Sequence, residues 1–416
     1  MTFPAGFLWG TATSSHQVEG DNRNNDWWAW EQEPGRIYGG QSSGLACDHY
    51  RRYLEDIELM AALGYNAYRF SLEWSRIEPE PGHFSVAALD HYGQVLEALR
   101  ARGIEPVVTL HHFTLPLWLA RAGGFLNPEA VERFDRYARE VAAALGREVR
   151  YWVTINEPMV LATQSYLLGL WPPGHQNLFE TLRVARHLLL AHARAYHRLK
   201  EVNGEAMVGL AKHLRVVDPG RPGLLDRGVA GLLDYVFNWA FLSGVERGRL
   251  PLPFGFNQRV PELLQTQDFL GVNYYSRDIV FFNWRSPGTL FAKMEVAAGR
   301  ERNDLGWEVY PEGLYRLLKR LQAYGKPILI TENGITTGDD LARQRFLLDH
   351  LRQVKRALEE GVEVRGYFYW SLLDNFEWAE GYRARFGLVE VDFATQKRSP
   401  RPSAHLYGEM ARKNGF

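Results

Sequence analysis

The chain has 416 residues, of which 46% are hydrophobic and 23% are charged, a composition typical of a globular protein with a large core. Acidic and basic residues balance to a formal net charge of −1, so no basic footprint indicates a nucleic-acid partner. The single cysteine, Cys47, excludes a disulfide framework within the chain and favours a reducing compartment. We interpret it as a small buried thiol and not as a nucleophile.

The first ten residues, MTFPAGFLWG, lack the basic and apolar regions of a signal peptide. We therefore expect a cytoplasmic protein. The longest apolar stretch, 228–245, contains Asp234 and Asn238 and is shorter than a comfortable bilayer span. It is interpreted as a buried helix, and we expect no membrane partner.

Short apolar runs alternate with helical patterns along the chain. The candidate strands lie at 6–12, 66–74, 105–113, 150–156, 206–214, 268–275, 327–333 and 364–372. The segments 88–103 and 314–327 show the spacing of amphipathic helices, with glycine at their ends. Several strands are apolar at consecutive positions, which is typical of parallel strands covered on both faces. This pattern predicts an α/β protein with one (β/α)8 TIM barrel.

The barrel is expected to form a single catalytic domain over residues 1–416, because no linker or repeat divides the chain. A minimal barrel needs roughly 250 residues, so the remaining residues must lie in long loops at the C-terminal face. The segment 276–310 shows no period, and we expect it to be such a loop.

Polar and aromatic residues gather where the predicted strands end, which is where barrel enzymes place their sites. They are His16, Gln17, Glu19, Arg69, Glu73, His111, His112, Asn156, Glu157, Asn273, Tyr274, Tyr275, Glu332, Asn333, Trp370, Glu377 and Trp378. Groups that donate and accept hydrogen bonds, beside large aromatic faces, suit a polyhydroxylated ligand such as a sugar.

Two carboxylates, Glu157 and Glu332, follow different strands and would reach the same rim. Cleavage of a glycoside requires such a pair, one to protonate the leaving oxygen and one to attack the anomeric carbon or activate water. The carboxylate beside Arg69 would keep a low pKa, and the other would have its pKa raised. Pro158 is expected to end the strand and fix the turn after Glu157.

Other interpretations remain open for individual residues. Arg69 could pair with Glu73 as a structural ion pair, and the tryptophans could belong to the core. His111 and His112 could suggest a metal, but neighbours on a strand point to opposite faces. The histidines at 187, 192 and 197 are spaced by five, which does not place them on one helix face. We expect no metal and no cofactor.

Seven segments in succession resemble the signature blocks of the family 1 glycoside hydrolases. They are FPAGFLWGTATSSHQVEG, YRFSLEWSRI, TLHHFTLP, TINEP, GVNYYS, ITENG and YWSLLDNFEWAEGYRARFGL. The similarity runs from Phe3 to the C-terminus in the family's order. It implies a (β/α)8 fold and a retaining β-glycosidase activity on small-molecule β-glycosides and oligosaccharides.

The resemblance also implies roles for individual residues. Glu157 would be the acid/base and Glu332 the nucleophile, with Asn156 bonding the sugar 2-hydroxyl. Arg69 and Tyr275 would hold and tune Glu332, and Asn273 would support it. Further sugar contacts would come from Gln17, His112, Glu377 and Trp378, with Trp370 as the stacking floor and Trp307 on the aglycone side.

Three details refine this expectation. The family's histidine precedes an aromatic residue, so His112 before Phe113 matches it. The family usually has Trp-Asp where this chain has Phe113-Thr114, which leaves the preference among glucosides, galactosides and fucosides open. Glu377 would repel a 6-phosphate, and the presence of Glu157 distinguishes the chain from the family's thioglucosidases.

The sequence therefore predicts an exo-acting, retaining β-glycosidase whose two carboxyl groups lie about 5–5.5 Å apart. A transglycosylase that uses the same covalent intermediate is an alternative. A non-catalytic sugar-binding barrel is another, although such a protein would be expected to lose one carboxylate. The sequence leaves the oligomeric state open, a homo-oligomer included.

Overall fold

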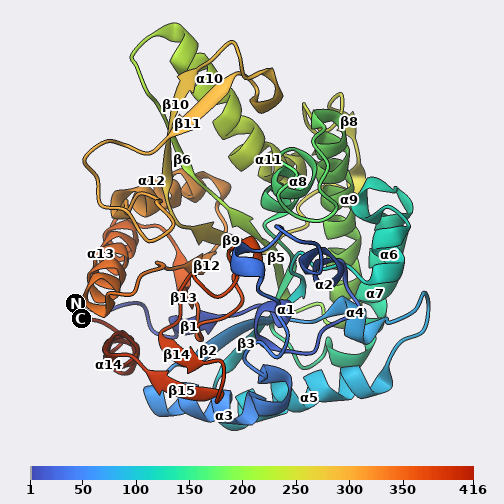
Figure 1. Cartoon of the computed structure of the whole chain (residues 1–416), viewed down its shortest axis with the longest axis vertical. Helices are drawn as coiled ribbons and strands as arrows, with labels where there is room; N and C mark the ends of the chain where they lie inside the picture. Colours follow the sequence, from blue (N-terminus) through green and yellow to red (C-terminus); the bar gives the residue numbers. More distant parts are fainter. Residues whose placement is uncertain (1) are drawn as a thin grey trace.

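The structure, a computed structural model, describes residues 2–416. Eight parallel strands close into a barrel in the order β1-β13-β12-β9-β5-β4-β3-β2 (Figure 1). These strands are β1 (Leu8–Ala12), β2 (Ala67–Ser71), β3 (Glu105–His111), β4 (Tyr151–Asn156), β5 (Met207–His213), β9 (Phe269–Tyr274), β12 (Ile328–Asn333) and β13 (Val364–Trp370). Each lies within one of the eight predicted segments, so the (β/α)8 expectation is confirmed.

Burial of the barrel strands explains their apolar sequences. Every residue of β2, β4, β9 and β12 is buried, because barrel side chains cover one face and helices cover the other. Strands that follow one another in the chain mostly pair directly; Val153 on β4, for example, pairs with Thr109 on β3 and Gly209 on β5. Polar side chains at the carboxyl ends are thereby brought to one rim.

Helices surround the barrel, and many begin at a residue that caps them. Asn177 accepts from the backbone N–H groups of Phe179 and Glu180 at the start of α9, and Ser85 accepts from that of Ala88 in α5. The helices are α1 (Ser15–Val18), α2 (Asp26–Glu31), α3 (His49–Leu63), α4 (Trp74–Ile77), α5 (Val86–Ala101), α6 (Leu117–Arg121), α7 (Glu129–Leu145), α8 (Pro158–Tyr166), α9 (Leu178–Val202), α12 (Pro311–Leu321), α13 (Asp340–Glu359) and α14 (Pro402–Lys413). The helices predicted at 88–103 and 314–327 correspond to α5 and α12.

A small lobe stands beyond the barrel, at the top of Figure 1. It contains a three-stranded sheet in the order β11-β10-β6, and its strands are β6 (Val216–Pro219), β10 (Arg277–Phe282) and β11 (Ala292–Glu295). Helix α10 (Leu224–Asp234) packs on this sheet through Ala230, which meets Val280 and Ala292. The segment 276–310 is the expected long connection, since it lies between β9 and α12 (Pro311–Leu321). It is not irregular, because two short strands in it pair with each other, and one of them pairs with β6.

The helical segment from Leu224 to Arg247 joins the lobe to the barrel. It consists of α10, a π-helical turn η3 (Tyr235–Trp239) and α11 (Ala240–Arg247). Its second half is mostly buried as predicted, but Leu232 and Tyr235 are exposed, so the interpretation of 228–245 as a buried helix holds only in part. By length and composition the segment could cross a membrane, and half of its most apolar window is buried inside the protein.

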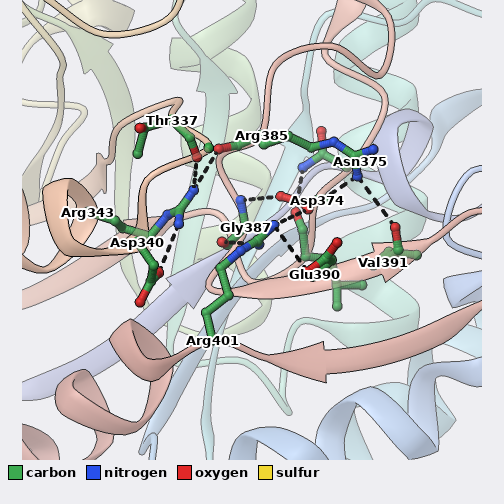
Figure 2. A network of polar contacts seen from close by, with 12 residues as sticks. Thr337, Asp340, Arg343, Asp374, Asn375, Arg385, Gly387, Glu390, Val391 and Arg401 are labelled. Atoms are coloured by element: carbon green, nitrogen blue, oxygen red, sulfur yellow. Dashed lines mark hydrogen bonds and ion pairs between the residues drawn. The ribbon is translucent and has the colours of Figure 1, made fainter.

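Short hairpins and a polar network complete the C-terminal region. The hairpins are β7 (Arg249–Leu250) with β8 (Gln258–Arg259), and β14 (Val389–Asp392) with β15 (Lys397–Pro400). Figure 2 shows buried Asp374 accepting from Arg401 at 2.8 Å and from Arg385 at 3.3 Å. Buried Arg343 donates to the carbonyls of Thr337 at 2.5 Å and Arg385 at 3.0 Å. These contacts tie the loop after β13 to the loop after β12 and to the hairpin.

Cys47 is fully buried and its thiol donates to the carbonyl of Asp374 at 3.1 Å. Burial raises the pKa of this thiol well above its ordinary value. The prediction of a small buried thiol is therefore confirmed.

Candidate active site

A cavity of about 240 Å³ opens at the carboxyl ends of the barrel strands. Both predicted catalytic carboxyls line it, from the ends of β4 and β12. Of the other predicted site residues, the structure places His112, Asn156, Tyr275, Trp307, Trp370, Glu377 and Trp378 on its wall. Gln17, Arg69 and Asn273 are almost fully buried and act through the side chains that they contact.

Glu157 directly follows β4 in an unusual backbone conformation. Its φ is 44°, in the left-handed region, and Phe113 and Trp378 on the same cavity also have positive φ values of 73° and 52°. Such positions cost on the order of 1–3 kcal/mol each and gather at functional sites. The strand ends at Asn156 as expected, but Pro158 continues directly into a helix, because it is the first residue of α8, where its fixed φ suits a helix.

Two donors hold Glu332. Arg69 donates to its Oε1 at 2.5 Å and the Tyr275 hydroxyl donates to its Oε2 at 2.6 Å. Arg69 also donates to Oδ1 of Asn156 at 2.7 Å, which connects the two catalytic strands. The alternative pairing of Arg69 with Glu73 is wrong, because Glu73 accepts from serine and threonine hydroxyls.

Two donors also converge on Glu157, both at Oε1. Asn273 Nδ2 lies 2.8 Å from this oxygen and His213 Nδ1 lies 3.1 Å from it. Asn273 therefore supports Glu157, contrary to the expectation that it supports Glu332. The Thr331 hydroxyl donates to the Asn273 amide oxygen at 2.6 Å, so the amide nitrogen faces β4.

His213 is the site residue that the sequence reasoning missed. It is the last residue of β5, and the strand-end inventory includes no residue from the corresponding segment 206–214. The signal was present, since His213 is a histidine at the carboxyl end of a barrel strand, as His111 is at the end of β3. Arg215 and Asp278, which extend the contacts of His213, also line the cavity.

The polar end of the cavity combines a carboxyl group with aromatic rings. Gln17 Nε2 donates to Glu377 at 3.1 Å and also lies 3.0 Å from the Phe376 carbonyl. Gln17 thus positions Glu377 from behind. The His112 ring stacks near Trp370, with centroids 5.9 Å apart and planes 22° apart, and Asn156 Nδ2 lies 3.0 Å from His112 Nε2.

The opposite end of the cavity is apolar. Leu167 and Leu182 come from the α8–α9 side, and Val236, Leu290 and Met294 come from the lobe and the segment beside it. A second cavity of about 150 Å³ adjoins this end. It shares four residues with the first and is otherwise lined by Leu232, Tyr235, Leu252 and Pro253. The lobe therefore forms one wall of the part of the cavity that lies beyond the two carboxyls.

His111 points away from the cavity and packs among aromatic rings. Its centroid lies 5.3 Å from that of Phe125 and 6.1 Å from that of Phe134. Within residues 2–416, no group of three or more histidine, cysteine or acidic side chains is arranged to hold a metal ion.

Comparison with known proteins shows which family the chain belongs to. The model of glycosyl hydrolase family 1 matches residues 1–416. The chain belongs to this family. It is therefore a hydrolase of O-glycosyl bonds, and the resemblance inferred from the seven sequence blocks is confirmed.

Solved structures and curated relatives of this family 1 hydrolase cover nearly its whole length. A β-glycosidase from Pyrococcus horikoshii is 46% identical with a TM-score of 0.94, covering 99% of this chain and 95% of that one. A β-glucosidase from Thermotoga maritima in complex with glucoimidazole is 36% identical with a TM-score of 0.94, and all of both chains is covered. A β-galactosidase from Pyrococcus woesei is 33% identical, over 99% of this chain and 98% of the relative.

The pKa directions in this family 1 hydrolase are the reverse of those predicted from sequence. Burial raises the pKa of Glu332 to about 7; Arg69 opposes this effect and the charge of Glu157 adds to it. Burial alone would also raise the pKa of Glu157, but His213 and Asn273 outweigh it and lower that pKa. The sequence prediction took account of Arg69 but not of the burial of Glu332 or of the donors to Glu157.

The two carboxyls titrate as a pair that shares one proton. The low pKa of Glu157 depends on a charged His213, yet burial lowers the pKa of His213 below its ordinary value. Near neutral pH the imidazole is uncharged and this influence is lost. The fully buried guanidinium of Arg69 requires the Glu332 carboxylate as its partner. Near neutral pH these two effects favour the shared proton on Glu157, against the individual pKa directions, and acid catalysis requires it there.

Proposed function

We propose that this protein is an exo-acting, retaining β-glycosidase that cleaves terminal β-glucosides, and also β-galactosides and β-fucosides. The observation that carries the proposal is the pair of buried carboxyls on one cavity with separate sets of donors. Relatives named β-glucosidase and β-galactosidase support the range of sugars.

In the first step, an ionised oxygen of Glu332 attacks the anomeric carbon. Glu157 gives its proton to the leaving oxygen as the glycosidic bond breaks, which produces the free aglycone and a covalent glycosyl-enzyme. Arg69 and Tyr275 hold Glu332 in place for this attack. In the second step, Glu157 takes a proton from water, which attacks the same carbon and releases the sugar with its original configuration.

The sugar lies at the polar end of the cavity in this proposal. His112, Asn156 and Glu377 bind its hydroxyls with Trp378, and Trp370 forms the floor for its apolar face. Burial raises the pKa of Glu377 to about 8, with the charge of Glu332 adding to the effect. A carboxyl group at this position can donate to and accept from sugar hydroxyls, and its ionised form disfavours a phosphorylated sugar.

The aglycone lies at the apolar end, beside Trp307 and the lobe. The adjoining second cavity, lined almost entirely by carbon atoms, suits an unbranched alkyl chain better than a further sugar unit. Substrates with apolar aglycones are therefore proposed as the better ones. The same covalent intermediate can also pass its sugar to an acceptor hydroxyl in place of water.

Two measurements test the proposed function together. NMR spectroscopy of the first-formed sugar from a β-glucoside should show the β-anomer, and the α-anomer would contradict the retaining mechanism. Intact mass spectrometry after exposure to 2-deoxy-2-fluoro glucosides, galactosides and fucosides should show one covalent adduct, located on Glu332 by digestion. An adduct on any other residue would refute the assignment of the nucleophile, and the relative rates of labelling rank the sugars.

A further inference from the structure

A line of polar contacts runs from the lobe to the acid/base carboxyl. Asp278 on β10 accepts from Arg215 Nη1 at 2.9 Å. Arg215 Nε in turn lies 3.2 Å from His213 Nε2, and His213 Nδ1 lies 3.1 Å from Glu157 Oε1. The contacts cross from the wall of the aglycone side to the catalytic group.

Arg215 determines which ring nitrogen of His213 carries a proton. An arginine nitrogen can only donate, so His213 Nε2 must accept from Arg215 and cannot carry a proton. The ring proton of a neutral His213 is consequently on Nδ1, where it is donated to Glu157. Without Arg215 either ring nitrogen could carry the proton.

Packing holds the His213 ring in the required orientation. One face stacks on Tyr275, with centroids 5.7 Å apart and planes 22° apart, and Phe237 meets the ring edge-on at 5.9 Å. His213 is 7% exposed. A ring rotation that exchanged the two nitrogens would have to displace these neighbours.

The fixed tautomer of His213 makes the two carboxyl oxygens of Glu157 different. Its Oε1 accepts from both His213 and Asn273, whereas within residues 2–416 no hydrogen-bond donor meets Oε2. A proton on the carboxyl is therefore carried by Oε2. We propose that Arg215 and Asp278 are positioning residues that fix the tautomer of His213 and thereby select Oε2 of Glu157 as the proton donor to the leaving oxygen.

This inference rests on the proposed function, in which Glu157 is the acid. It adds that the lobe takes part in the chemistry and does not merely form a wall. Arg215 and Asp278 both line the cavity, so an aglycone that fills the apolar end lies against the groups that set the acid.

The test compares two variants of Arg215 that differ in one property. In Arg215→Gln the side-chain nitrogen takes the place of Nε and can still donate to His213. In Arg215→Met a methyl group occupies the same place and cannot. Both variants remove the guanidinium charge and the ion pair with Asp278, so a difference between them reports the hydrogen bond alone.

The readout is kcat/KM on an alkyl β-glucoside, which needs a protonated leaving group, and on 2,4-dinitrophenyl β-glucoside, which does not. We expect Arg215→Met to lower kcat/KM about 10-fold or more on the alkyl glucoside and little on the aryl glucoside. This loss is a part of the roughly 10²–10⁴-fold rate increase that acid catalysis supplies. Arg215→Gln should recover most of the loss. Arg221→Met is the matched control and should change neither rate; the exposed Arg221 side chain pairs with the buried Asp226 elsewhere in the lobe.

The outcomes separate the two proposals. Equal losses on both substrates, or equal behaviour of Gln and Met, would overturn the positioning role. Asp278→Leu leaves Arg215 itself intact and should show the same split between substrates to a smaller degree; an unchanged ratio would remove Asp278 from the proposal. If the unaltered protein cleaves neither substrate, the proposed function fails and this inference fails with it.

Discussion

Glu157 and Glu332 are both buried carboxyls, and their partners make them different. Glu332 has one donor on each oxygen, so its negative charge is shared with a guanidinium and a phenol. Glu157 has both donors on one oxygen, which leaves the other free to carry a proton. The division of labour between nucleophile and acid thus follows from which atoms the neighbours contact.

The acid role predicts a dependence on the leaving group. Replacing Glu157 by alanine should lower kcat/KM on the order of 10²–10⁴-fold for alkyl glucosides. The loss should be much smaller for 2,4-dinitrophenyl glucoside in the step that forms the intermediate, because that leaving group needs no proton. Pre-steady-state release of dinitrophenol measures this step directly. A uniform loss across leaving groups would indicate that Glu157 is not the acid.

The Tyr275 hydroxyl provides a test of the nucleophile through pH. Its hydrogen bond lowers the pKa of Glu332 against the effect of burial, so Tyr275→Phe should raise that pKa further. Because Glu332 must be ionised to attack, the acidic limb of the pH profile of kcat/KM should move to higher pH. At neutral pH the rate should fall roughly 10- to 100-fold, the value of a hydrogen bond to a charged group. A shift of the acidic limb to lower pH would contradict the assignment.

Among the elements, the lobe formed by β6, β10, β11 and α10 sets what can lie beyond the scissile bond. Leu232 on α10 lines the second cavity, whereas Leu225 on the same helix is 64% exposed and does not. The two leucines therefore form a matched pair for testing the aglycone side.

Leu232→Asp should lower the ratio of kcat/KM for octyl over methyl β-glucoside by roughly 10-fold, since each buried methylene contributes about 0.8 kcal/mol. Leu225→Asp should leave the ratio unchanged. Steady-state kinetics on a series of alkyl glucosides provides the measurement. If the unaltered protein shows no rise in kcat/KM with chain length, the second cavity does not bind the chain.

The elements also show what the sequence could and could not reveal. Long apolar runs predicted all eight barrel strands, because strands buried on both faces carry a strong local signal. The lobe sheet could not be predicted from the sequence, because β10 has only one fully buried residue, Val280. It also pairs with β6, which lies about 60 residues earlier in the chain. His213 lies at a predicted strand end, but its importance comes from Arg215 and Asp278, which only the folded lobe brings to it.

For the whole molecule, the network around Asp374 links three segments of the C-terminal region. Asp374→Ala would leave Arg385 and Arg401 without a buried partner and should lower the free energy of unfolding by about 3–5 kcal/mol. Urea denaturation, or the apparent Tm where unfolding is irreversible, measures the loss. The exposed pair of Arg383 and Glu380 is the control, and Arg383→Ala should change stability by about 1 kcal/mol or less. Equal losses of unfolding free energy for the two substitutions would show that the network does not stabilise the fold more than an exposed ion pair does.

Arg69 has a further consequence that concerns the order in which the molecule is built. Its partners Asn156 and Glu332 lie 87 and 263 residues away along the chain, and the bond from Asn273 to Asn156 spans 117 residues. Contacts of such long range form late in folding, because the intervening loops must close first. No fragment of a few β/α units can contain the complete set of donors. Enzymatic activity is thus a reporter of barrel closure itself, and a nascent chain acquires its chemistry only when its last strands have been added.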